Sequence, residues 1–215
     1  MNCDEKKRVI ENGKKYVALL FENEASGHDR FHTFRVMRTA SKLARTEGAD
    51  EFVSVLAALL HDVDDRKLFP DSEGLPNASS FLEREKVDSE TARAVLAVIP
   101  EISFKGTGSV IPSTPEGRCV QDADRLDALG AIGIARTFAF GGSRGRAMYD
   151  PDVPPVMNMN AEQYRTARST SVNHFYEKLF LLGEMMNTES GRREAERREA
   201  FMRSFLDEFF SEWND

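Results

Sequence analysis

The sequence predicts an all-α protein, and three observations lead to that expectation. Apolar residues recur at helical spacing in one segment after another. No run of alternating β-branched residues bounded by hairpin turns occurs along the 215 residues. No internal repeat appears at a period of about 20 to 50 residues, which argues against a solenoid.

Composition narrows the functional classes. The chain is 40% hydrophobic and 30% charged, with a net charge of -7, which is typical of one globular domain. The acidic balance with scattered basic residues argues against a nucleic-acid polymer as partner. Without a long apolar segment, a membrane partner is not expected. Two cysteines, Cys3 and Cys119, make no disulfide framework, so a reducing, cytoplasmic setting is the default expectation.

The first half of the chain contains three segments of strong helical periodicity. Apolar residues recur at helical spacing from Glu5 to Asn23 and from Asp29 to Thr46, and Gly48 is placed to end the second helix. The segment from Glu51 to Asp65 is the most apolar in the chain. It predicts a helix in the protein interior.

Loops and shorter helices are expected to follow. Leu68 to Asn77 is rich in proline and glycine, which is typical of a loop. A short charged helix is predicted to begin at Ser79 or Ser80, and another helix covers Asp88 to Val98. Ile99 to Gly117 is the longest irregular stretch and a candidate substrate-facing loop.

The second half returns to helix after two interruptions. Val120 to Phe140 is apolar with internal glycines, which predicts one kinked helix or two. Ser143 to Asn160 is predicted to be a loop, followed by helices from Ala161 to Met186 and from Arg192 to Trp213. Four aromatic residues of the last helix form a stripe that we expect to face the core: Phe201, Phe205, Phe209 and Trp213.

The most informative polar residues are His61 and Asp62, at the C-terminal end of the apolar helix. Burying an imidazole and a carboxylate together is costly unless each has a partner. A divalent cation offsets that cost, because imidazole nitrogen and carboxylate oxygen are good ligands for Mn, Fe, Co, Ni or Zn. A hydrogen-bonded pair at the helix end is the alternative interpretation.

Two further helices contribute ligand types. His32 lies on a face of a helix that packs on the core, and a cluster of carboxylates opens the apolar segment near residue 120: Asp122, Asp124 and Asp127. Three helices therefore each bring a metal-ligating group inward, which favours a metal centre.

The order His, His-Asp and later Asp resembles the H…HD…D pattern of the all-helical HD-domain phosphohydrolases. Five blocks in the right order, spread over most of the chain, extend the resemblance to their bacterial YedJ/YpgQ-type branch: Gly27–His32, Ala58–Asp62, Gln121–Ala128, Gly130–Arg136 and His174–Leu179. The resemblance implies a single HD-type domain over residues 1–215. Its metal-site core is expected at about 25–140 and a C-terminal helical portion at about 160–215.

Matched to the family motif, the metal ligands fall on His32, His61, Asp62 and Asp124. Asp124 is chosen because the last ligand of the family is the Asp that follows Ala in the Ala-Asp-Arg-Leu block. Two nitrogens and two carboxylate oxygens leave open positions on a six-coordinate ion, where water and a phosphate oxygen can bind side by side. We expect one divalent ion, with Mn preferred and Mg, Co, Ni, Fe or Zn as alternatives.

Asp65 is the candidate general acid/base. It lies three residues after Asp62, so on a continuing helix its carboxylate would reach a water on the metal. An acidic residue at this offset assists catalysis in related nucleotidases, as the resemblance implies. An exposed carboxylate at the helix end is the alternative, and Asp64, pointing about 100° away, is the weaker choice.

Basic side chains beside the ligands are candidates for binding phosphate. Lys67 is preferred, and Arg35 is expected to brace a ligand carboxylate. His28 faces the substrate or caps its helix, while His174 and Lys178 share a face and are candidates for the pocket lining.

The function that follows is a metal-dependent phosphohydrolase acting on a small phosphorylated molecule. The resemblance favours a nucleoside triphosphate pyrophosphohydrolase, which converts an NTP or dNTP to the monophosphate and pyrophosphate. A phosphomonoesterase or nucleotidase is the alternative enzyme, and a nucleotide-binding sensor is the non-enzymatic one. Apolar helix faces fit a homodimer as well as a core.

Overall fold

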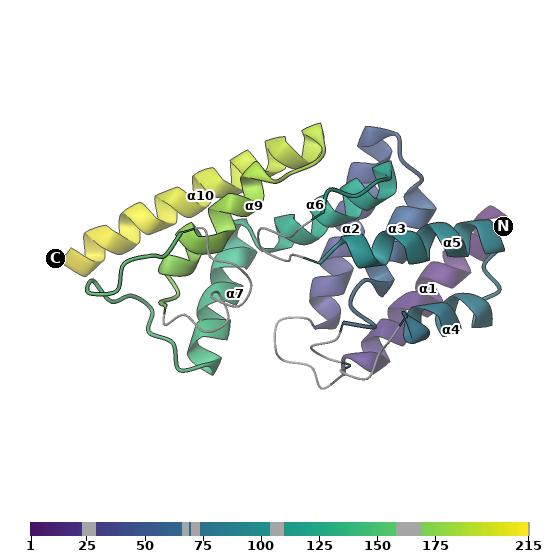
Figure 1. The fold of residues 1–215 in the computed structure, drawn as a ribbon, viewed down its shortest axis with the longest axis horizontal. Coiled ribbons are helices and arrows are strands. Elements are labelled where there is room, and N and C mark those ends of the chain that lie inside the picture. Colours follow the sequence, from purple (N-terminus) through teal and green to yellow (C-terminus); the bar gives the residue numbers. More distant parts are fainter. Residues whose placement is uncertain (23–28, 66–68, 70–73, 104–109, 158–168, 215) are drawn as a thin grey trace. The chain divides into compact units, whose positions relative to one another are not determined.

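The computed structural model confirms the all-α expectation. It describes residues 1–22, 29–65, 69, 74–103, 110–157 and 169–214, and these contain helices and no strand (Figure 1). In chain order the elements are α1 (Cys3–Leu20), α2 (Arg30–Glu47), α3 (Glu51–Leu60), α4 (Pro76–Arg84), α5 (Ser89–Val98), the 3-10 helix η1 (Ile99–Glu101), α6 (Pro115–Asp127), α7 (Gly130–Ser143), the π-helical segment η3 (Phe175–Leu179), α9 (Phe180–Glu184) and α10 (Glu189–Asn214). Within the described ranges, none of these helices has the length and apolar composition that a membrane span requires.

The chain divides into two compact units, and the boundary between them lies inside α6. Unit 1 comprises residues 1–103 and 110–124, and unit 2 includes residues 125–215. That the two units form one domain over residues 1–215 stays a prediction.

The helix α3 is the centre of unit 1. It packs against α1, α2 and α5, and every residue from Phe52 to Leu60 is buried (Figure 1). An apolar helix surrounded by other helices gains stability from burial on all its faces. The expectation that this segment lies in the interior is confirmed.

Polar caps set the starts of four helices in unit 1. Asn2 and Glu5 exchange side-chain and backbone hydrogen bonds, so α1 begins at Cys3 rather than at Glu5. In α2, α3 and α5 the cap is a single carboxylate that accepts from backbone N–H groups of the first turn: Asp29, Asp50 and Asp88 respectively. Gly48, with a φ of 73°, ends α2 as predicted.

Two boundaries near α3 and α4 differ from the prediction. The helix α3 ends at Leu60 rather than at Asp65, and residues 61–64 form a turn. The helix α4 begins at Pro76, ahead of the predicted Ser79 or Ser80. Proline is favoured at the first helical position because its missing N–H would have no partner there.

The apolar stretch from Val120 to Phe140 forms two helices, one of the two outcomes that the sequence allowed. Gly130, at the start of α7, has a φ of 73°, which a residue with a side chain rarely adopts. A Cβ on Gly133 would lie 2.1 Å from the carbonyl oxygen of Ala128. Glycine therefore permits the close backbone contact at this break.

Unit 2 contains α7, η3, α9 and α10, and α10 packs against α7 and α9. The predicted helix from Ala161 to Met186 is wrong at residues 169–172, which are not helical. Residues 161–168 lie outside the described ranges. The wider π-helical spacing of η3 carries no signal in the sequence pattern.

The aromatic stripe of α10 faces the core only in part. Phe205 and Phe209 pack on Phe138 of α7, whereas Phe201 is 53% exposed and Trp213 is 45% exposed. A repeat of four residues drifts by about 40° per step around a helix of 3.6 residues per turn. The stripe consequently turns toward solvent at its ends, and the buried positions of α10 are Gly191, Ala195, Met202 and Leu206.

Candidate metal centre

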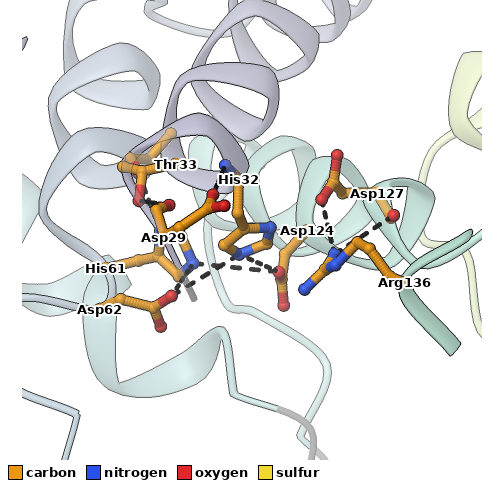
Figure 2. A network of polar contacts seen from close by, with 9 residues as sticks. Asp29, His32, Thr33, His61, Asp62, Asp124, Asp127 and Arg136 are labelled. Atoms are coloured by element: carbon orange, nitrogen blue, oxygen red, sulfur yellow. Dashed lines mark hydrogen bonds and ion pairs between the residues drawn. The ribbon is translucent and has the colours of Figure 1, made fainter. Parts of the chain in front are cut away.

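His32 enters the centre from the first turn of α2. The side chain of Asp29 accepts a hydrogen bond from the backbone N–H of His32 at 2.7 Å, which starts the helix (Figure 2). The imidazole is buried, with 1% of its surface exposed. The helix start thus fixes the position from which His32 points inward.

His61 and Asp62 are buried in the turn that directly follows α3. Nδ1 of His61 lies 2.8 Å from the carbonyl oxygen of Ala58. Because a carbonyl only accepts, the neutral imidazole carries its hydrogen on Nδ1 and its lone pair on Nε2. That tautomer is the one a metal requires when Nε2 is the ligand atom.

Asp124 completes the group from the last turn of α6. Its Oδ1 lies 3.4 Å from Nε2 of His32 and 3.9 Å from Nε2 of His61. Oδ2 of Asp62 lies 3.6 Å and 3.2 Å from the same two nitrogens. The side chain of Asp124 is 26% exposed, so solvent reaches the centre beside it. We call these four residues the donor quartet.

The distances within the donor quartet fit a metal ion. Ligand atoms of His32, His61 and Asp62 all lie within 4.8 Å of one another, and Figure 2 shows the four side chains converging. Donors about 2.1 Å from one ion lie about 3 to 4 Å apart. The cluster can therefore hold a divalent ion.

The electrostatics of the quartet favour a cation. Burial by itself lowers the pKa of His61. The negative charges of Asp62 and, to a smaller extent, Asp124 outweigh burial and raise the pKa of His61 to about 10. Burial raises the pKa of Asp124, while the hydrogen bond with His32 and the charge of His61 bring it below its usual value. The centre without metal thus holds a proton firmly, and a divalent ion would displace it.

The prediction that Asp65 lies on a continuing helix is wrong, because α3 ends at Leu60. The backbone N–H of Asp65 instead donates to the carbonyl oxygen of Asp62 at 3.1 Å, within the turn. Asp65 is half-buried and still follows the ligand candidates closely. Its role as general acid/base stays a prediction.

Of the predicted substrate-binding residues near the ligands in the sequence, the structure describes Arg35. Arg35 is half-buried on α2, one turn after His32. His28 and Lys67 lie outside the described residues. The contacts of these side chains with a substrate remain predictions.

His174 and Lys178 lie in unit 2, at and within η3. Backbone hydrogen bonds of 3.0 and 2.9 Å from residues 171 and 172 to residues 147 and 148 fix the neighbouring segment that carries Arg146. Burial, followed by the charges of Lys178 and Arg146, lowers the pKa of His174 to about 3. The charges of Lys178 and Arg146 thus both act on His174, and the roles of His174 and Lys178 in a substrate pocket stay predictions.

One polar contact near the quartet was not predicted. Nη1 of Arg136, from α7, donates to Oδ2 of Asp127 at 2.6 Å (Figure 2). Asp127 lies one turn after Asp124 on α6, so helical spacing within the carboxylate cluster could have singled it out. The identity of its partner depends on the break between α6 and α7.

Comparison with known proteins identifies the family of this fold and motif. A model of the HD domain family matches residues 31–129, which include the donor quartet. The protein YpgQ of Bacillus subtilis is 37% identical over 203 residues, covering 93% of this chain and 91% of the relative. The chain belongs to the HD-domain family.

Two solved structures resemble this HD-domain chain over almost its whole length. An HD-superfamily hydrolase from Bacillus thuringiensis is 44% identical with a TM-score of 0.78, covering 97% of this chain and 98% of that one. B. subtilis YpgQ in complex with ADP is 32% identical with a TM-score of 0.79, covering 97% and 96%. This chain is accordingly a phosphohydrolase enzyme of the HD superfamily.

Proposed function

We propose that the protein hydrolyses nucleotides with one divalent metal ion, converting an NTP or dNTP to the monophosphate and pyrophosphate. The observation that carries this proposal is the donor quartet, whose nitrogen and oxygen atoms lie 3.2 to 3.9 Å apart across three elements. The similarity to YpgQ, a protein seen in complex with ADP, supports a nucleotide as the substrate.

In this proposal the quartet holds the ion, with Mn preferred and Mg, Co, Ni, Fe or Zn as alternatives. When bound, the ion supplies Lewis acidity and lowers the pKa of water. His32 and His61 provide neutral nitrogens, and Asp62 and Asp124 provide negative charge. Among the residues that the structure describes, this is the one group of three or more potential ligands close enough together to hold an ion. The proposal therefore takes a single ion.

Asp65 is proposed to take the proton from the attacking water and to return it to the leaving group. Its backbone contact with Asp62 keeps it beside the quartet, and the residue is half-buried. General acid/base catalysis by a positioned carboxylate contributes about 100- to 10,000-fold.

The charge of the substrate phosphates requires cationic partners. Lys67 is our first candidate, with Arg35 bracing a ligand carboxylate and His28 facing the substrate. In unit 2, His174 and Lys178 are proposed to bind the phosphate chain, and Arg146 adds positive charge beside them. A neutral His174 suits this role, because it donates one hydrogen bond without adding charge.

Metal analysis of the purified protein and product identification with an NTP and dNTP panel plus Mn²⁺ test the proposal. Pyrophosphate and monophosphate are the expected products. Orthophosphate as the sole inorganic product would favour a phosphomonoesterase, and nucleotide binding without turnover under any metal would favour a sensor. Either result would overturn pyrophosphate release as the activity.

A further inference from the structure

We propose that Asp64 is a positioning residue for the metal centre. Its carboxylate fastens the turn that carries His61 and Asp62 to the start of α4. The inference rests on the proposed function, because it takes these two residues as metal ligands. All residues that enter the argument belong to unit 1.

The turn that carries the two ligands has little helical support. Its backbone hydrogen bonds join Val63 to Leu60 at 3.4 Å and Asp65 to Asp62 at 3.1 Å. Bonds of three-residue spacing have poorer geometry than those of an α-helix and hold short segments. The orientation of the ligands therefore depends on contacts from outside the turn.

Asp64 supplies such contacts. Its side chain is buried, Oδ1 accepts the backbone N–H of Asn77 at 3.0 Å, and Oδ2 accepts that of Ala78 at 2.9 Å. In return, Nδ2 of Asn77 donates to the carbonyl oxygen of Val63 at 2.8 Å. Three hydrogen bonds thus hold the end of the turn against α4.

The start of α4 explains why this contact forms. Leu75, the N-cap residue, has a φ of 59° and no side-chain acceptor, and Pro76 has no N–H. The N–H groups of the second and third helical positions normally bond to the N-cap side chain. Here Asp64 replaces that cap from another part of the chain, and the positive end of the helix dipole stabilises its charge.

Asp64 and Asp62 have different roles in the turn. The charge of Asp64 serves the start of α4, whereas Asp62 provides the carboxylate oxygen that faces the two imidazoles. Without Asp64, the turn loses two of the three hydrogen bonds that hold it to α4, and the two ligands lose their fixed geometry. Loss of a hydrogen-bond partner that orients a ligand directly lowers metal affinity about 10- to 100-fold, and we expect the same order for the loss of this anchor.

The test is calorimetric titration of Mn²⁺ into metal-free full-length protein, at a temperature where circular dichroism shows each variant folded. We expect Asp64→Ala to raise the Mn²⁺ Kd about 10- to 100-fold. Asn77→Ala, which removes one of the three bonds, should raise it less. Asp88→Ala is the matched control, because Asp88 caps α5 through Thr91 at 3.0 Å on an exposed site. It should lower Tm and leave the Kd at the wild-type value.

A wild-type Kd in Asp64→Ala, with Tm lowered as in the control, would overturn the inference and leave the proposed function intact. If Asp64→Ala does not fold, Asn77→Ala decides by the same criterion. A wild-type protein that binds no Mn²⁺, or an Asp62→Ala variant with unchanged Kd, would instead overturn the metal centre itself. The two failures are therefore distinguishable.

Discussion

Nδ1 of His61 donates to the carbonyl oxygen of Ala58 one turn earlier, at 2.8 Å, and this bond directs Nε2 of His61 toward Asp62 and Asp124. The apolar helix α3 therefore orients the ligand with its own last turn. Because this backbone bond keeps Nδ1 protonated, only Nε2 exchanges a proton for a metal ion.

The metal-free protein should lose stability as the pH rises from about 6.5 to about 10. The pKa of His61 is raised from 6.5 to about 10 in the folded state, so its stabilising proton is fully bound below 6.5 and is lost through the folded pKa. Bound Mn²⁺ displaces that proton and should remove this loss. Tm measured against pH, with EDTA and with Mn²⁺, checks both statements, and parallel curves would contradict them.

Asp62→Ala and Asp65→Asn should separate metal binding from proton transfer. The first removes a ligand and should lower kcat more than about 100-fold together with the metal content. The second should lower kcat about 100-fold or more while the metal content stays at the wild-type level. Kinetics and metal analysis on the same preparations check this, and full activity in Asp65→Asn would remove Asp65 from the mechanism.

His174 should stay neutral between pH 5 and 8. Its pKa is lowered to about 3, so the unfolded state binds a proton more readily, and this group costs stability as the pH falls from about 6.5 to about 3. The ring protons of His174 in an NMR titration should show no shift between pH 5 and 8. A midpoint near 6.5 would show that the side chain lies in a more solvated environment.

Lys178→Ala should raise the KM for a nucleotide while the Mn²⁺ Kd stays constant. A charged hydrogen bond to phosphate contributes about 1.5 to 3 kcal/mol, or on the order of 10- to 100-fold in KM. Lys15→Ala removes the same charge from an exposed site on α1 and serves as the control. Equal KM values in both variants would exclude Lys178 from substrate binding.

Gly133→Ala should destabilise the protein by about 1 to 3 kcal/mol, because the added methyl would meet the backbone oxygen of Ala128 at 2.1 Å. Gly142, on the same helix, has no atom within 4 Å of such a methyl. Gly142→Ala should stabilise by about 0.5 to 1 kcal/mol through helix propensity. Urea unfolding of the two variants measures the difference, and equal midpoints would contradict the close contact.

Much of the fold could be predicted because the relevant signals are local. Asp29, Gly48 and Asp88 act on the backbone a few residues away, and the helix boundaries that they set were predicted closely. The burial of α3 follows from a composition that is apolar on all faces. The assignment to the HD-domain family depended on motif order and was confirmed by comparison.

The remaining differences depend on contacts between distant residues. The end of α3 at Leu60 and the start of α4 at Pro76 are coupled through Asp64, which lies 13 residues from Asn77. No pattern of nearby residues shows that Leu75 needs such a substitute cap. The four-residue aromatic spacing in α10 likewise predicted a continuous core stripe, although helical drift exposes Phe201 and Trp213.

The complete burial of α3 should make its amide hydrogens exchange slowly. Amide hydrogens from Phe52 to Leu60 are shielded on every side, so they should exchange with deuterium only when unit 1 opens as a whole. The adjoining residues 61–64 are held by fewer backbone bonds, so they should open on a shorter timescale despite the bonds from Asp64 to α4. Slow exchange in α3 would then give way to faster exchange at the very next residue, His61. Deuterium uptake in this ligand-bearing turn should fall when the metal ion binds.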